Sequence, residues 1–125
     1  MLDESRHHGS VPRPIREDER RLVEILVRDH PQSEQFLREL TNAIVEDMAD
    51  DGMGSIRFAG IYDGERRFGT VAAEAQGLDA DHVPVSMAVN LDTRGHLYEL
   101  DIWKIDFSPL QDYPRPENVH RVEVR

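Results

Sequence analysis

LYELDIWKIDFSPL, residues 97–110, holds the only Trp of the chain and nearly alternates apolar with charged side chains. Such alternation is typical of a β-strand that buries one of its two faces. The other face of the strand must meet either solvent or a partner. The stretch therefore predicts a strand of a sheet and marks its outward face as a candidate binding surface.

Alternation divides the first half of this strand into an inward, apolar set and an outward set. The inward set is Tyr98, Leu100 and Ile102, and the outward set is Glu99, Asp101 and Trp103. Further along, the apolar residues are Ile105 and Phe107, which have the spacing of the outward set. A strand that changes its buried face needs a bulge or a bend, so we expect a bend within residues 103–106.

Two helices are predicted before the strands. Residues 16–28 follow Pro14, which suits a helix start, and they carry acidic side chains in the first turn. Their apolar side chains form one stripe, made by Leu22, Val23, Leu26 and Val27. Ser33 suits the N-cap of a second helix that ends near Thr41. Both helices are expected to bury one face.

Residues 43–48 fit either a continuation of the second helix or a short strand. We favour the strand, because the turn Asp50-Asp51-Gly52 would join it to the alternating residues 55–58 as a hairpin. Further alternating stretches cover residues 68–75, 83–91 and 97–107, with short polar turns between them. Short turns favour antiparallel pairing of consecutive strands.

The elements together predict an α+β fold, in which two N-terminal helices pack on one face of a four- to five-stranded antiparallel meander sheet. A length of 125 residues fits one domain. Residues 1–13 lack periodicity and are expected to form a disordered leader. Residues 14–113 form the single α+β domain, and residues 114–125 an extended Pro-rich C-terminal segment.

Composition narrows the possible partners. The formal charge is -10 and there is no Cys, which excludes disulfides and thiolate zinc sites. An acidic surface disfavours nucleic acid and favours a basic protein partner. No apolar run reaches the roughly 18 residues that a membrane span needs. We therefore expect a cytoplasmic protein with neither a membrane nor a nucleic acid as its partner.

No catalytic constellation stands out, since the Ser residues lack a nucleophile elbow and the His residues lack ligand spacing. Glu99 and Asp101 lie about 7 Å apart along a strand, and Asp50 and Asp51 occupy a loop without the spacing of a calcium site. We expect no catalytic residue, metal or cofactor. A small metal-dependent hydrolase that uses these carboxylates is the alternative, as is a structural, self-associating domain.

Trp103 has two interpretations. In the first it packs in the core against the Pro-rich segment, while Glu99 and Asp101 pair with arginines on a neighbouring strand, such as Arg57, Arg66 or Arg67. In the second it is an exposed aromatic residue of an interface, where Trp is enriched and carboxylates complement a basic partner. The candidate partner-binding residues are Glu99, Asp101, Trp103, Asp50 and Asp51.

Two motifs, DDGMGSIRF at residues 50–58 and LYELDIWKIDFSPL at residues 97–110, resemble a family of small bacterial domains of unknown function. RRFGTVAAEA and VPVSMAVNLD, between them, extend the resemblance over about residues 16–113. The resemblance implies no catalytic residues. Immunity proteins, which neutralise a toxin encoded next door, share this size and acidity, by analogy of architecture alone. The expected function is a non-enzymatic acidic protein-binding module, most concretely an immunity-like inhibitor of a basic partner.

Overall fold

A computed structural model describes residues 11–59 and 64–122 of the chain. Residues 1–10 of the expected leader lie outside the described residues. Arg13, the last residue of the expected leader (residues 1–13), pairs with Val45 in the sheet, so the leader does not extend to this residue. Within the described ranges no helix is long and apolar enough to cross a membrane.

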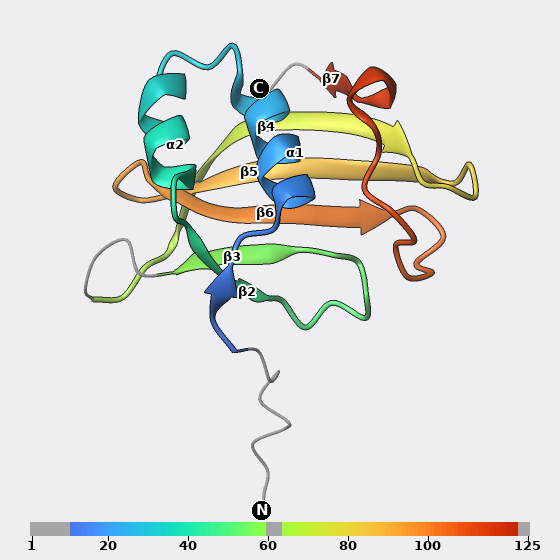
Figure 1. Cartoon of the computed structure of the whole chain (residues 1–125), viewed down its shortest axis with the longest axis horizontal. Helices are drawn as coiled ribbons and strands as arrows, with labels where there is room; N and C mark the ends of the chain where they lie inside the picture. Colours follow the sequence, from blue (N-terminus) through green and yellow to red (C-terminus); the bar gives the residue numbers. More distant parts are fainter. Residues whose placement is uncertain (1–10, 60–63, 123–125) are drawn as a thin grey trace, which may run out of the picture.

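Within these ranges the chain forms two α-helices and one antiparallel sheet of seven strands, in the order β1-β2-β3-β6-β5-β4-β7 (Figure 1). The elements are β1 (Arg13–Pro14), α1 (Glu17–Val27), α2 (Ser33–Leu40), β2 (Ile44–Asp47), β3 (Ile56–Ala59), β4 (Phe68–Leu78), β5 (Pro84–Asp92), β6 (Leu97–Lys104) and β7 (His120–Val122). A short 3-10 helix, Pro116–Asn118, precedes β7. The predicted helices and the strand interpretation of residues 43–48 are confirmed.

The predicted fold class is wrong. A sheet of seven strands with two short α-helices, as the described residues form, is closer to all-β than to an α+β fold with a four- to five-stranded meander. β1 was missed because two residues are too few to show alternation, whereas β7 is an edge strand within residues 119–124, whose weak alternation fits either an edge strand or a tail. The strand order is also not a meander, since β6 returns to lie between β3 and β5, as in a Greek key.

The core lies between one face of the sheet and the two helices (Figure 1). Leu22, Val23, Leu26 and Val27 of α1 are buried there, as their single stripe predicts. The segment between β6 and β7 lies on the same side of the sheet. Its Leu110 N–H donates to the carbonyl of Gly52 at 2.9 Å, and its Tyr113 hydroxyl to that of Gly54 at 2.7 Å. The opposite face of the sheet has no covering layer among the described residues.

The inward face of β6 corrects two expectations. Leu100 and Ile102 are buried as predicted, but Tyr98 is only half-buried and Leu97 takes the inward place. The register with β5 shifts at this point, so that Tyr98 is an extra residue, as in a β-bulge. Beyond Ile102 the inward position belongs to Lys104, which is fully buried. The strand therefore keeps its buried face up to its end, and the expected change of face does not occur.

Candidate functional site

The uncovered face of the sheet, called here the open face, carries three of the five predicted partner-binding residues. Residues paired directly across neighbouring strands share a face, and this pairing gives three rows. The rows are Gln76–Ser86–Trp103, Glu74–Ala88–Asp101 and Asn90–Glu99–Arg57. Since β3, β6, β5 and β4 are neighbours in that order, side chains from residues 57 to 103 meet on one surface.

An exposed aromatic pair lies at one end of the open face. The rings of Trp103 and Phe107 meet edge to face, with centroids 5.6 Å apart and planes at 67°. Trp103 is 44% exposed, while Phe107 and the intervening Ile105 are 65% and 53% exposed. Phe107 adopts a left-handed backbone (φ 61°) and its N–H donates to the carbonyl of Lys104 at 2.9 Å. Trp103 is therefore a surface residue rather than a core residue.

A shallow hollow of about 340 Å³ lies beside this pair on the open face. Its polar and apolar lining comes from β4, β5, β6 and the last described residue of β7. The residues on its open-face side are Glu74, Gln76, Ser86, Ala88, Asp101, Trp103 and Val122. The hollow thus joins the indole of Trp103 to two carboxylates, a combination that can receive a positively charged group.

Asp101 is the perturbed acid of the open face. Burial raises its pKa above the ordinary value of an aspartate, and the nearby charges of Glu99 and Asp50 raise it further. The hydroxyl of Ser55, 3.4 Å from Oδ1, opposes this rise. In residues 11–59 and 64–122 no basic side chain forms an ion pair with Asp101 or with Glu74. The charge of Asp101 is therefore uncompensated within the described chain.

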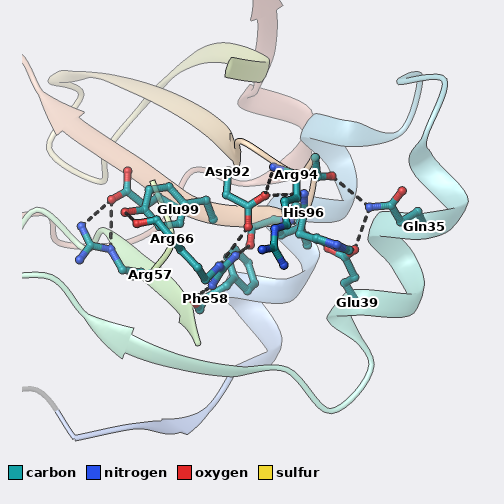
Figure 2. A network of polar contacts seen from close by, with 12 residues as sticks. Gln35, Glu39, Arg57, Phe58, Arg66, Asp92, Arg94, His96 and Glu99 are labelled. Atoms are coloured by element: carbon teal, nitrogen blue, oxygen red, sulfur yellow. Dashed lines mark hydrogen bonds and ion pairs between the residues drawn. The ribbon is translucent and has the colours of Figure 1, made fainter. Parts of the chain in front are cut away.

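Glu99, in contrast, forms an ion pair within the sheet. Its Oε2 lies 2.7 Å from Nη2 of Arg57 (Figure 2). Its Oε1 accepts a hydrogen bond from the Asn90 amide at 3.2 Å. The expected pairing of Glu99 with an arginine of the next strand is confirmed. Arg66 does not take part, because it pairs with buried Asp92 at 3.0 Å and donates to two backbone carbonyls (Figure 2). The guanidinium groups of Arg57 and Arg66 each lie 5.3 Å from the ring centre of Tyr98.

Asp50 and Asp51 belong to the hairpin turn between β2 and β3. The Asp50 carboxylate accepts the backbone N–H of Met53 at 3.1 Å and of Ser55 at 3.0 Å, so it holds the turn. Asp51 and Gly52 both have positive φ, 59° and 84°, as a type I′ turn requires. Asp50 reaches Asp101 only through Ser55, and no hydrogen bond or ion pair joins Asp51 to the open face among the described residues.

Sequence reasoning missed one residue of the hollow and one buried charge on the opposite face of the sheet. Glu74 joins the hollow, although its alternation with inward Ala73 and Ala75 could have placed it on the outward face of β4. The sequence could not show that Glu74 lies across Ala88 from Asp101, because this arrangement depends on β5 lying between β4 and β6. Buried Lys104 was missed as well, although it continues the spacing of Leu100 and Ile102.

No three His, Asp or Glu side chains of the described ranges are grouped so that they could hold a metal ion. The strand and loop carboxylates proposed for a hydrolase are thus not gathered into a ligand set within these ranges. The hollow is instead bordered by the indole of Trp103, has the small side chain of Ala88 at its base, and carries the carboxylates of Glu74 and Asp101, which are unpaired among the described residues. Such a surface is suited to recognition of a cation.

Comparison with known proteins identifies the family of the chain and no individual relative. No curated protein and no solved structure matches it. Residues 12–114, which include both helices and strands β1 to β6, match the family described as "Domain of unknown function (DUF6984)". The expected resemblance to a domain family of unknown function is confirmed at this level. The chain belongs to the DUF6984 family.

Proposed function

We propose that this protein is a non-enzymatic binding module that uses the open face of its sheet to bind a basic protein. The observation that carries the proposal is the exposed aromatic pair, Trp103 and Phe107, beside the uncompensated carboxylate of Asp101. Large exposed aromatic residues supply much of the binding free energy at the centres of interfaces. Exposed apolar surface next to charge marks a binding site more often than an ordinary surface.

The charge of the whole chain supports the same partner. At a formal charge of -10, the protein attracts a basic protein over a longer range than a contact surface alone could. Complementary fields raise the association rate and reject acidic competitors. The acidic side chains Glu74 and Asp101 supply this field locally on the open face.

The most concrete form of the proposal is an immunity-like inhibitor in the cytoplasm of a bacterium, directed against a basic toxin. Small size, acidity and an exposed recognition surface support this form by analogy. It makes the product of the adjacent gene the first partner to test. It also predicts that the inhibitor covers the toxin's basic active surface without performing any chemistry itself.

The test compares two variants in binding to that gene product by isothermal titration calorimetry. Trp103→Ala should weaken binding by about 30-fold or more, as expected for an aromatic hot spot. Leu37→Ala is the matched control, because Leu37 is an exposed apolar residue of α2, on the other side of the sheet. Equal dissociation constants for wild type and Trp103→Ala would refute the use of the open face. A complete lack of binding would refute the immunity-like form.

Self-association is the competing use of the same surface, and light scattering at high protein concentration distinguishes it. A monomeric mass that does not change with concentration supports a foreign partner. A dimer that Trp103→Ala converts to a monomer would instead assign the open face to a second copy of the chain.

A further inference from the structure

The hollow on the open face has a geometry that narrows the chemistry of the partner, and the following argument rests on the proposed function. Ala88 of β5 pairs with Glu74 of β4 on one side and with Asp101 of β6 on the other. Neighbouring strands are about 4.8 Å apart, so the two acidic residues flank a methyl group at a separation of roughly 10 Å between their Cα atoms. The two carboxylates therefore border the hollow from opposite sides, with a low floor between them.

Trp103 supplies the third side of the hollow. It lies two residues beyond Asp101 on β6, about 7 Å along the strand on the same face. Its neighbours across the strands are Ser86 and, one strand further, Gln76. A cation above Ala88 can thus contact the indole while uncharged polar groups border it. Contact between a cation and the face of an indole is favourable.

The hollow has no cation of its own among the described residues. Of the basic residues that strand pairing places on the open face, Arg57 is engaged by Glu99 at 2.7 Å and His120 of β7 lies opposite Gln76, outside the lining of the hollow. Asp101 is disfavoured as a carboxylate by burial and by the charge of Glu99, which raise its pKa. A cation supplied by a partner would stabilise the ionised carboxylate of Asp101, and this stabilisation would add to the binding free energy.

The shape of the hollow favours one cation over others. A metal ion needs several oxygen ligands at about 2.0–2.6 Å from a single point, and no such group of three exists in the described ranges. The ammonium of Lys is a compact, strongly hydrated point charge. A guanidinium is flat, carries five N–H donors that can reach carboxylates on two sides, and stacks on aromatic faces.

We infer that the hollow receives an arginine side chain of the basic partner, with its guanidinium between Glu74 and Asp101 and against the indole of Trp103. The partner's arginine is then the residue that the acidic open face recognises, and the exposed aromatic pair covers the apolar part of its side chain. Lysine at the same position binds more weakly, because it lacks the planar contact with Trp103.

Nuclear magnetic resonance titration of the whole 15N-labelled protein tests this inference without a known partner. The probe is N-acetyl-arginine methylamide, and the neutral citrulline analogue is its shape control. The chain has a single Trp, so one indole N–H signal reports on Trp103 directly. We expect saturable shifts of this signal and of the Ser86 and Ala88 amides with the arginine compound, and none with the citrulline analogue. The lysine analogue should produce the same pattern with a higher dissociation constant.

Charge-neutralising variants supply the second arm of the test. Glu74→Gln and Asp101→Asn should each weaken binding of the arginine compound by about three- to fivefold, as for a partly exposed ion pair. Asp51→Asn is the matched control, because it removes the same charge from the hairpin turn, away from the hollow. It should leave the dissociation constant unchanged.

Three results would overturn the inference: no saturable shift, equal shifts with the citrulline analogue, or equal losses in Asp51→Asn and Asp101→Asn. Failure of the inference can be told apart from failure of the proposed function. If Trp103→Ala abolishes binding of the protein partner while Glu74→Gln and Asp101→Asn do not affect it, the open face is the interface and the arginine site is wrong. If the arginine compound binds as expected but the tested basic proteins do not, the site stands without that function.

Discussion

The ammonium Nζ of Lys104 lies 2.7 Å from Oδ2 of Asp79, and both side chains are fully enclosed by protein. Asp79 also accepts the backbone N–H groups of Ala80, Gln111 and Asp112 at 2.6, 2.7 and 2.9 Å. One carboxylate thus joins the turn after β4, the end of β6 and the segment that follows it. This pair explains how β6 can keep a charged residue on its buried face, since a buried charge must be paired and hydrogen-bonded.

Loss of the Asp79 carboxylate should destabilise the protein more than loss of its neighbour Asp81. Asp81 also contacts Lys104 at 2.7 Å, but its side chain is 30% exposed and solvent can replace part of the interaction. In Asp79→Ala three backbone donors lose their acceptor, and the buried ammonium of Lys104 loses the more buried of its two carboxylate partners. Thermal unfolding followed by circular dichroism should show a clearly larger fall in Tm for Asp79→Ala than for Asp81→Ala. Equal falls would show that the pair does not hold these segments together.

The same carboxylate should shape the acid limb of stability. Burial acts to raise the pKa of Asp79, but the hydrogen bonds from Lys104 and from the backbone outweigh it and leave the pKa lowered. A lowered folded-state pKa contributes stability that is present above the unfolded value of about 3.9 and is lost as pH falls through the folded value. Urea unfolding should therefore show wild type losing more stability than Asp79→Asn below about pH 4. Asp51→Asn, which removes one exposed carboxylate, should follow wild type.

Truncations on the two faces of β6 should separate core from surface. Leu100→Ala and Ile102→Ala should each lower the free energy of unfolding by roughly 2–5 kcal/mol, because each leaves a cavity in the core. Trp103→Ala should cost no more than about 2 kcal/mol, since it removes a half-exposed ring and one edge-to-face contact. Chemical denaturation measures all three. A loss for Trp103→Ala as large as that for Leu100→Ala would contradict the surface placement.

Asp101→Asn should stabilise the fold while weakening the recognition proposed for the open face. The substitution removes a carboxylate that burial and the charge of Glu99 disfavour. The gain should stay below about 1 kcal/mol at neutral pH, because the side chain is partly exposed and solvent screens the repulsion. A raised folded-state pKa means that the gain shrinks as pH falls through that value, since Asp101 is then neutral in wild type too.

Denaturation curves of wild type and Asp101→Asn at pH 7 and near pH 3 test this prediction. We expect a difference in favour of the variant at pH 7 that disappears near pH 3. Improved stability together with weaker binding is the behaviour of a residue kept for function. A variant that is less stable than wild type at pH 7 would show that Asp101 is held for structure, through its contact with Ser55.

Several local features could be read from the chain because they depend on neighbours in sequence. The apolar stripe of α1 predicted its buried face, and the turn at Asp50–Gly52 predicted the hairpin of β2 and β3. Alternation predicted that Leu100 and Ile102 are buried and that Glu99 faces an arginine. The same alternation failed at Tyr98, because a bulge inserts one residue and its position depends on the register with β5.

The composition and spacing of the chain alone were sufficient to identify an acidic protein with amphipathic helices and strands, and to place Glu99, Asp101 and Trp103 on one face. Only the tertiary structure decided which strands are neighbours, and with it the hollow between Glu74 and Asp101. The physical reason is that periodicity records which side of a strand is apolar, while pairing depends on how distant segments pack and close their loops. The burial of Lys104 follows the same rule, because only the folded chain brings Asp79 to it.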